Sequence, residues 1–265
     1  MKVVIFCGGL GMRIRESGDD IPKPMVPIGY RPILWHLMKY YAHFGHKDFV
    51  LCLGHKADVI KKYFLNYEET ISNDFVLSSG GRKVELMNSD ISDWRITFAD
   101  TGITSNLGQR LKAVEKYVED DEMFLANYAD GLTDMHLPTV IDQFQHAGKI
   151  ASFVSVRPNL SYHAVSSGGD GLVEKITAIT NTDLRINGGY FLFQRSIFDY
   201  LCQGEELVQE PFQRLIAAKQ LLAYPYDGFF ACMDTFKDKR HLEDLYARGK
   251  APWEVWHKNG GPRAS

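Results

Sequence analysis

The residues best suited to chemistry lie close to the N-terminus. The chain contains Gly8-Gly9-Leu10-Gly11-Met12-Arg13 directly after an apolar run, and Lys23 follows between Pro22 and Pro24. Glycine lets backbone N–H groups approach a ligand without an intervening Cβ, and the arginine and lysine add positive charge. A loop of this kind followed by two cations predicts a site for a nucleoside triphosphate.

Three kinds of glycine loop compete for this segment. A dinucleotide-binding fingerprint would need glycine at position 14, where the chain has Ile14, and a P-loop would need Gly-Lys followed by Ser or Thr. The chain matches in full the third pattern, G-G-x-G-x-R followed by a lysine in K-P, which resembles nucleotidyltransferases that form sugar nucleotides. Glycines that serve only a tight turn would leave Arg13 and Lys23 unexplained.

Two aspartates are candidate ligands for Mg²⁺, a cation that prefers carboxylate, phosphate and water oxygens. Asp130 follows the apolar run Phe124–Tyr128, and Asp234 lies in Met-Asp-Thr. An aspartate after a strand is as often a cap or turn residue. The prediction of a Mg²⁺ site at these two residues therefore depends also on the resemblance described below.

Apolar runs alternate with helical patterns through the first half of the chain. The expected strands are Val3–Phe6, Phe49–Leu53 and Phe124–Tyr128, and the expected helices are Pro32–Phe44, Asp58–Tyr67 and Leu107–Val118. This alternation predicts an α/β fold with a doubly wound, mainly parallel, Rossmann-like sheet. Ligands bind such sheets at the carboxyl ends of the strands, where the glycine loop and Asp130 would lie.

Two segments interrupt the alternation. Residues 70–99 are polar with short β-like pieces, and we expect a small β excursion there. Residues 150–193 predict antiparallel additions, on the sugar-phosphate side of the site. The expected later elements are the strands Ala151–Val156, Gly171–Ile179, Gly188–Phe193, Leu222–Tyr226 and Gly228–Met233 and the helices Pro211–Gln220 and Arg240–Arg248. Without a linker or repeat, we expect one domain over 1–256 and a C-terminal tail over 257–265.

Composition excludes several classes of function. The 265 residues carry a formal net charge of −3, which argues against nucleic-acid or anionic-membrane partners. No apolar run approaches the roughly 20 residues of a membrane span, and the N-terminus enters a strand without a signal peptide. The four cysteines are scattered without metal-binding spacing, which predicts reduced thiols in a cytoplasmic protein.

From residue 1 to about 256 the chain resembles the bacterial glucose-1-phosphate cytidylyltransferases. The segment D-W-R-I-T-F-A-D-T-G resembles one that sets this group apart from thymidylyl- and uridylyltransferases. Other matching segments are G-Y-R-P-I-L-W-H-L-M-K-Y-Y, G-Q-R-L-K, Y-A-D-G, I-N-G-G-Y, Q-E-P, M-D-T, D-K and G-K-A-P-W. The resemblance implies a GT-A-like nucleotidyltransferase fold, transfer of CMP from CTP to a sugar 1-phosphate with release of pyrophosphate, and a homo-oligomer.

The resemblance also implies roles for individual residues. Arg13 would hold the leaving phosphates and Lys23 the α-phosphate or the attacking phosphate, and these two are the predicted catalytic residues. Thr104 and Arg110 would contact the cytidine. The predicted nucleotide-binding residues are Gly8, Gly9, Leu10, Gly11, Met12, Arg13, Lys23, Thr104, Arg110 and Ala129; the acceptor-binding residues are Tyr128, Asn187 and Lys175; the Mg²⁺ ligands are Asp130 and Asp234.

The chain departs from the family pattern at two places. Met12 replaces the usual threonine of the glycine loop, where backbone amides do most of the binding. The family's E-K-P before I-N-G-G is replaced by Ala178-Ile179-Thr180, and Glu174-Lys175 lies four residues early, in mid-strand. Side chains alternate along a strand, so this pair is a poor substitute unless the strand bulges. We therefore expect an intact nucleotide half and an altered acceptor half.

Two alternatives remain open. The same reaction could use dTTP or UTP, since base choice depends on loop contacts that the sequence does not position. A protein of another class, a non-catalytic nucleotide- or sugar-phosphate-binding homologue, is the second alternative. Intact Arg13, Lys23, Asp130 and Asp234 argue against that second alternative.

Overall fold

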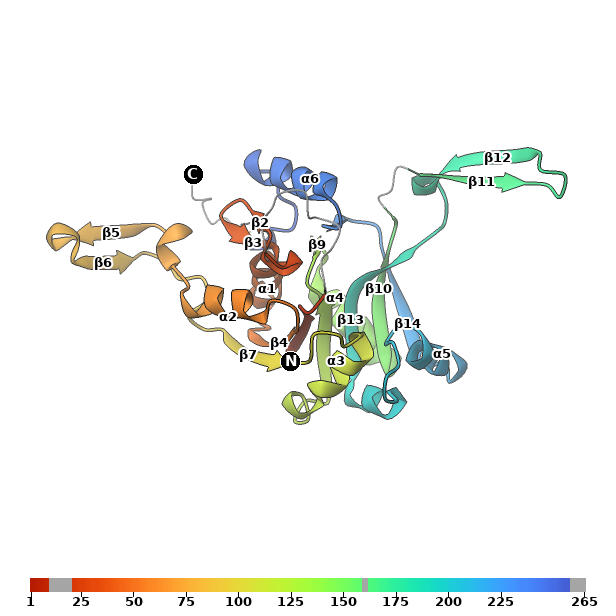
Figure 1. The fold of residues 1–265 in the computed structure, drawn as a ribbon, viewed down its shortest axis with the longest axis horizontal. Coiled ribbons are helices and arrows are strands. Elements are labelled where there is room, and N and C mark those ends of the chain that lie inside the picture. The colour runs from red at the N-terminus through yellow and green to blue at the C-terminus, as the bar shows by residue number, and fades with distance from the viewer. Residues whose placement is uncertain (10–20, 159–161, 258–265) are drawn as a thin grey trace.

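The computed structural model describes residues 1–9, 21–158 and 162–257. The predicted site residues Leu10, Gly11, Met12 and Arg13, and the tail from residue 258, lie outside the described residues. A seven-stranded sheet with the order β14-β10-β13-β8-β1-β4-β7 forms the centre of the molecule (Figure 1). Its strands are β1 (Val3–Phe6), β4 (Asp48–Leu53), β7 (Arg95–Asp100), β8 (Met123–Tyr128), β10 (Ala151–Val156), β13 (Ile186–Gln194) and β14 (Leu221–Tyr226).

The sheet is mainly parallel, as the alternation of strands and helices predicts. β1 pairs in parallel with β4 and β8, β4 with β7, and β10 with β14. β13 runs antiparallel to both of its neighbours, β8 and β10. The carboxyl ends of β1, β4, β7 and β8 therefore meet at one edge of the sheet, where ligands of doubly wound folds bind.

Helices cover both faces of this sheet because its central strands are apolar on both sides. In β1, Val3 and Ile5 face one core, while Val4 and Phe6 face the other. The first core is covered by α1, α2, α4 and α6, and the second by α3 and α5. The helices are α1 (Ile33–His43), α2 (Ala57–Leu65), α3 (Leu107–Ala113), α4 (Leu137–Ala147), α5 (Glu210–Ala217) and α6 (Phe236–Ala247).

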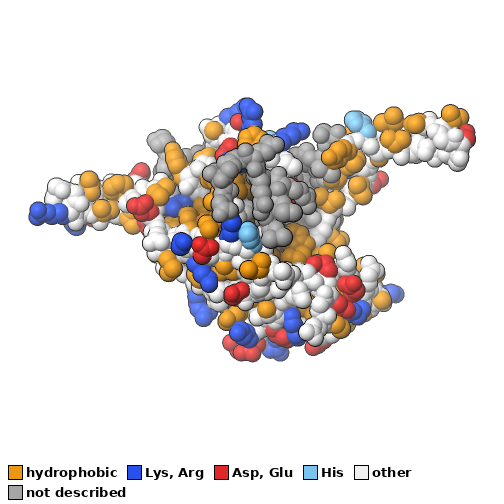
Figure 2. Space-filling model, viewed as in Figure 1, with side chains coloured by type: hydrophobic (Ala, Val, Ile, Leu, Met, Phe, Trp, Pro, Cys, Tyr) orange, Lys and Arg blue, Asp and Glu red, His pale blue; other side chains and the backbone are white. Residues whose placement is uncertain are grey.

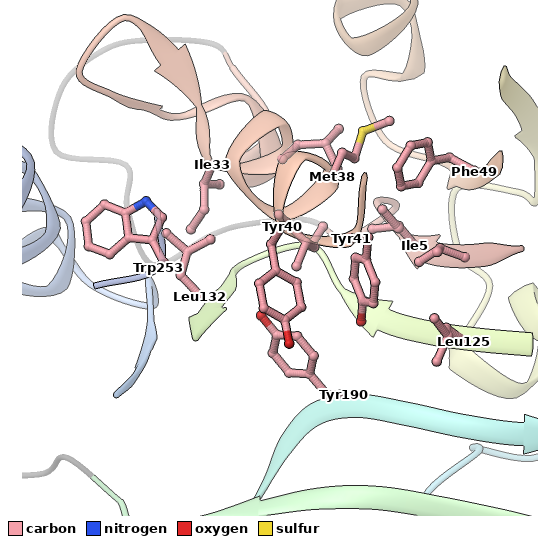
Figure 3. Packing of buried hydrophobic residues seen from close by; sticks show 14 of the residues in the cluster. Ile5, Ile33, Met38, Tyr40, Tyr41, Phe49, Leu125, Leu132, Tyr190 and Trp253 are labelled. Carbon is pink, nitrogen blue, oxygen red and sulfur yellow. The ribbon is translucent and has the colours of Figure 1, made fainter. Parts of the chain in front are cut away.

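Three buried tyrosines connect α1 to the strands that carry the site (Figure 3). The Tyr40 hydroxyl donates to the Met135 carbonyl at 2.8 Å, and the Tyr190 hydroxyl donates to the Gly131 carbonyl at 2.9 Å. Tyr41 accepts a hydrogen bond of 2.9 Å from the side chain of Asn127, which lies on β8. Because these hydroxyls are satisfied inside the core, they fix the turn after β8, which holds Asp130.

Short two-stranded sheets complete the fold. β9 pairs with β15, β2 with β3, and the hairpins β5–β6 and β11–β12 project from the body on opposite sides (Figure 1). Their strands are β2 (Pro27–Ile28), β3 (Arg31–Pro32), β5 (Phe75–Ser78), β6 (Lys83–Leu86), β9 (Gly131–Thr133), β11 (His163–Ser167), β12 (Val173–Ala178) and β15 (Phe230–Cys232).

The structure differs from the sequence-based expectation in several elements. Arg95–Asp100 is not part of the excursion that we expected over 70–99; it is β7, the edge strand beside β4. α4 and β11 were not expected. The expected helix Leu107–Val118 ends at Ala113 and continues as a 3₁₀ turn over Glu115–Tyr117. None of the helices in the described part of the chain has the length and apolarity to cross a bilayer.

Candidate active site

A cavity of about 450 Å³ lies at the carboxyl edge of the central sheet. Its lining comes from the end of β1 and the segment that follows it, from Lys23 and Pro24, from the loop between β7 and α3, from the end of β8 and from the loop before α5. The lining residues are Phe6, Cys7, Gly8, Gly9, Lys23, Pro24, Ile103, Thr104, Ser105, Asn106, Leu107, Arg110, Tyr128, Ala129, Asp130 and Glu206. The predicted residues Gly8, Gly9, Lys23, Thr104, Arg110 and Ala129 thus line one cavity.

Lys23 lies between the two predicted metal ligands. Its ammonium nitrogen is 2.5 Å from Asp130 Oδ2 and 2.6 Å from Asp234 Oδ1. Asp234 reaches this position because β15 pairs with β9, directly after Asp130, and because the Met233 N–H donates to the Asp130 carbonyl at 2.9 Å. Two aspartates that lie about a hundred positions apart in sequence are brought together by a lysine from a third segment.

The electrostatics of this group favour a charged lysine. Burial lowers the pKa of Lys23, but the charge of Asp130 and hydrogen bonds to Asp130 and Asp234 raise it more, so the pKa lies above its ordinary value. The ammonium group therefore stays protonated and neutralises part of the charge of the carboxylates. The site is built to hold a cation between two acidic groups.

Cys232 belongs to the same group, although it is not among the site residues predicted from the sequence. Its Sγ is 3.5 Å from Asp234 Oδ2, and one ligand atom each from Asp130, Cys232 and Asp234 lies within 4.8 Å of the others. Cys232 is the last residue of β15, and Asp234 follows it by two positions. The converging carboxylate oxygens fit a divalent cation.

Arg110 is buried against Gly8, with 4% of its surface exposed. Its guanidinium donates to the carbonyls of Gly8 and Leu53 at 3.0 and 3.2 Å and to Thr101 Oγ1 at 2.8 Å. These partners lie at the ends of β1, β4 and β7, so one side chain joins three strand ends. Arg110 lines the cavity, as expected of a nucleotide contact, while its described hydrogen bonds are to protein groups.

The close approach of Arg110 explains the first glycine of the loop. A Cβ placed on Gly8 would lie 2.0 Å from Arg110 Nη1, whereas one placed on Gly9 would meet nothing within 4 Å. A Cβ on Gly54 would also lie 2.8 Å from Arg110 Nη1. The guanidinium thus requires glycine on both sides of it, at the ends of β1 and β4.

The candidate acceptor residues divide into two groups. Tyr128 and Asn187 lie together, since the Asn187 side chain hydrogen-bonds to Tyr128 and its Oδ1 accepts a 2.8 Å bond from the Gly189 N–H. The Tyr128 ring also fills the space in which Gly189, at φ +75°, would carry a Cβ. Lys175, in contrast, is exposed in mid-strand on the projecting hairpin β11–β12, opposite Ser166 (Figure 1).

Ala178-Ile179-Thr180, which stand where the family has E-K-P, lie at the base of the same hairpin. Ala178 ends β12, and Ile179–Asn181 form a 3₁₀ turn that leads back toward β13. Neither segment lines the cavity, and the structure does not bring Lys175 together with Lys23, Asp130 and Asp234.

Glu206 is a second residue of the cavity that the sequence did not indicate. Its Oε2 accepts a 3.4 Å hydrogen bond from the Leu107 N–H, and its Oε1 is buried and has no hydrogen-bond partner among the described residues. An acidic residue in a loop carries no pattern that would distinguish it from a solvated surface charge. Only the fold places this carboxylate against α3 and the cavity.

A cavity at the carboxyl edge of a doubly wound sheet, lined by a lysine that contacts two aspartates, is typical of α/β proteins that bind nucleotides. The family model described as nucleotidyl transferase matches residues 2–235. Glucose-1-phosphate cytidylyltransferase of Salmonella typhimurium is 40% identical over 258 residues, covering 97% of this chain and 100% of that protein. The probable glucose-1-phosphate cytidylyltransferase of Bacillus subtilis is 36% identical over the same shares.

The solved structures agree with this assignment at the level of the fold. UDP-glucose pyrophosphorylase from Acinetobacter baumanii superposes with a TM-score of 0.67 and 16% identity, covering 97% of each chain. The chain belongs to the nucleotidyl transferase family, in the group of the glucose-1-phosphate cytidylyltransferases. The fold class and the family predicted from the sequence are confirmed.

Proposed function

We propose that this protein transfers CMP from CTP to a sugar 1-phosphate and releases pyrophosphate. A phosphate oxygen of the acceptor forms a bond to the α-phosphorus of CTP, and the bond from that phosphorus to the oxygen bridging to the β-phosphate breaks. The observation that carries the proposal is the contact of Lys23 with Asp130 and Asp234 beside a cavity that Gly8 and Gly9 also line. The relatives named as glucose-1-phosphate cytidylyltransferases support the choice of substrates.

The chain's own residues would act mainly by position and charge, as phosphoryl-type transfer requires. The Gly8 and Gly9 backbone would lie against the nucleotide. Lys23 would exchange a carboxylate for a phosphate oxygen, and Arg13 would hold the leaving phosphates. Tyr128 and Asn187, which hydrogen-bond to each other, are the candidates to orient the acceptor.

A divalent cation, for which we propose Mg²⁺, would be held by Asp130 and Asp234. When bound, it supplies positive charge against the phosphate oxygens. The two carboxylates fit this role because their oxygens converge and already hold one cation, the Lys23 ammonium group.

The experiment is a pyrophosphate-release assay with Mg²⁺, each of the four NTPs, and a panel of sugar 1-phosphates. We expect release with CTP and a sugar 1-phosphate acceptor. Release with dTTP or UTP but not CTP would contradict the base assignment, and no release with any pair would favour a non-catalytic binding protein.

The identity of the acceptor is tested in the same panel. The loss of E-K-P favours a sugar 1-phosphate other than plain glucose 1-phosphate, because the family's lysine would hold the sugar phosphate and a charge-assisted bond contributes roughly 1.5–3 kcal/mol. Efficient turnover of glucose 1-phosphate that is unaffected by Lys175→Ala would show that the acceptor half is not altered in this way.

We further propose a homo-oligomer and a cytoplasmic location. All four cysteines, Cys7, Cys52, Cys202 and Cys232, are free thiols, in keeping with a reducing compartment. The two projecting hairpins support self-assembly, since each exposes apolar side chains far from the body of the molecule (Figure 2). An isolated two-stranded hairpin is marginally stable in water, so a second surface is expected to cover it.

A further inference from the structure

The inference concerns how the cavity distinguishes one nucleobase from another, and it rests on the proposed use of CTP. Lys23 carries the positive charge of the lining that suits phosphates. Glu206 lines the same cavity beside the loop between β7 and α3, attached to the first turn of α3 through the Leu107 N–H. A carboxylate beside a triphosphate would repel it, so Glu206 suits the uncharged end of the nucleotide.

The backbone around Glu206 is held in place by α3. The Asn106 side chain donates to the Gly204 carbonyl at 2.9 Å. Gly108 lies so close that a Cβ there would be 2.3 Å from the Glu205 carbonyl oxygen. Leu207, with none of its surface exposed, anchors the other side of the loop in the core. The Glu206 side chain therefore starts from a fixed position against the cavity.

The carboxylate of Glu206 has acceptor capacity that the protein does not use. Oε2 receives one hydrogen bond of 3.4 Å, and Oε1, which is buried, receives none from the described residues. A buried acceptor left without a donor costs roughly 1–3 kcal/mol. The terminal torsion of glutamate is broad, so a rotation of the carboxyl group can present either oxygen to the cavity.

We propose that Glu206 determines base specificity by accepting a hydrogen bond from the exocyclic amino group of cytosine. An ionised carboxylate only accepts hydrogen bonds. Cytosine presents an amino donor at C4, where uracil and thymine present a carbonyl acceptor. Opposite a carboxylate, UTP and dTTP would leave two acceptors facing each other, and a site built to receive a donor strongly rejects an analogue that lacks it.

The test is the substitution Glu206→Gln, with kcat/KM measured for CTP, UTP and dTTP in the pyrophosphate-release assay. Glutamine keeps a carbonyl oxygen for the Leu107 N–H and replaces the second acceptor with an amide donor, which suits the C4 carbonyl of uracil and thymine. We expect the ratio of kcat/KM for CTP to that for UTP to fall by about tenfold or more, with the melting temperature unchanged.

Glu205→Gln is the matched control, because Glu205 is a neighbouring carboxylate that pairs with Arg214 and does not line the cavity. This control should keep the wild-type ratio. An equal loss for all three nucleotides in Glu206→Gln, or no change, would overturn the role of Glu206 in base choice. A wild-type enzyme that does not prefer CTP would instead contradict the proposed function, so the two failures are distinguishable.

Discussion

At the scale of single residues, the site is defined by close contacts of two cationic side chains. Lys23 is the cation between Asp130 and Asp234, and Arg110 is the cation beneath Gly8. Gly8 and Lys23 were predicted because their types and spacing match a known loop, whereas Arg110, Asp130 and Asp234 depended on the resemblance to the cytidylyltransferases. The sequence did not predict Cys232 or Glu206, because a single thiol or carboxylate has no pattern until the fold places it.

Lys23→Met tests the role of the ammonium group between the carboxylates. We expect the rate of pyrophosphate release to fall about 100-fold or more, as for loss of a group that stabilises developing charge. We also expect Mg²⁺ to raise the melting temperature of the variant more than that of the wild type, because the cation no longer competes with Lys23. Lys47→Met removes an exposed lysine paired with Asp93 and serves as the control; an equal Mg²⁺ response in Lys23→Met and wild type would contradict this view.

Gly8→Ala tests the contact with Arg110. The new Cβ would lie within 2.0 Å of the guanidinium, so the buried side chain must move and break bonds to three strand ends. We expect a loss of about 1–3 kcal/mol in the free energy of unfolding, measured by chemical denaturation. Gly9→Ala, whose Cβ meets nothing within 4 Å, should be close to wild type in stability. Equal stability of the two variants would show that Arg110 adapts without cost.

At the scale of elements, capping boxes begin the two helices that follow the site segments. Asn106 caps α3 just after Thr104, and Thr235 caps α6 just after Asp234. In the second, Asp238 Oδ2 accepts from the backbone N–H groups of Asp234 and Thr235 at 3.1 and 2.8 Å. The helix start therefore holds Asp234, the proposed metal ligand, in its orientation.

Asp238→Ala would remove these bonds without changing any group that lines the cavity. We expect a loss of about 1 kcal/mol in stability, typical for a cap, together with weaker binding of Mg²⁺ in a thermal-shift titration. Asp244→Ala, near the other end of α6, is the control. Unchanged Mg²⁺ binding in Asp238→Ala would mean that Asp234 is positioned by other contacts.

The elements that the sequence predicted well are those with continuous apolar runs. β1, β8 and β10 are buried on both faces, and their bounds match or lie within one residue of the prediction. β7 was misassigned to the excursion because it is an edge strand of mixed burial, and such a run does not reveal its partner. β11 is exposed along its whole length, so hydrophobic periodicity gives no sign of it.

At the scale of the whole molecule, the two ends of the chain share one core. The Trp253 indole N–H donates to His36 Nδ1 at 3.3 Å, and His36 Nε2 lies 3.0 Å from the Ile28 carbonyl oxygen (Trp253 is labelled in Figure 3). Neutral His36 fits both contacts, with Nδ1 as acceptor and Nε2–H as donor. Burial lowers the pKa of His36 to about 4.

This pKa predicts how stability depends on pH. The unfolded chain binds a proton at His36 near its ordinary pKa of 6.5, while the folded chain does not until about pH 4. The contribution of neutral His36 to the free energy of unfolding is therefore complete above the unfolded pKa. It falls by on the order of 3 kcal/mol as the pH drops from about 6.5 to 4. Chemical denaturation of the wild type and of His36→Gln across this range measures the dependence of the free energy of unfolding on pH. Burial also lowers the pKa of His46 to about 4, so His46→Gln measures the share of this second histidine. An identical slope in wild type and His36→Gln would contradict the prediction.

The proposed self-assembly through the hairpins also concerns the whole molecule. The β5–β6 register puts Phe75 opposite Leu86 and Leu77 opposite Val84, so one face is apolar, and these four side chains are 40–58% exposed. In β11–β12, Val165 opposes Ile176, both at least 60% exposed. The tip of the first hairpin carries Arg82 and Lys83 and that of the second Asp170 and Glu174, at opposite ends of the molecule (Figure 2).

We therefore expect a head-to-tail contact between the two hairpins of neighbouring copies. Reversing both charges at either tip should reduce the assembled mass measured by light scattering after gel filtration, and reversing both tips in one chain should restore it. Reversal of Lys47 and Asp93, an exposed pair on the body, is the control. A monomeric wild type, or tip reversals without effect, would contradict this contact.

The packing of Trp253 against His36 has a consequence for how the protein is made. The core around α1 includes Ala251, Trp253 and Val255, which are among the last described residues of the chain. While the chain is being synthesised, α1 emerges more than two hundred residues before this cover is available. The surface beneath Trp253 must therefore stay in contact with solvent or a chaperone until Trp253 itself has been synthesised and can fold back onto α1.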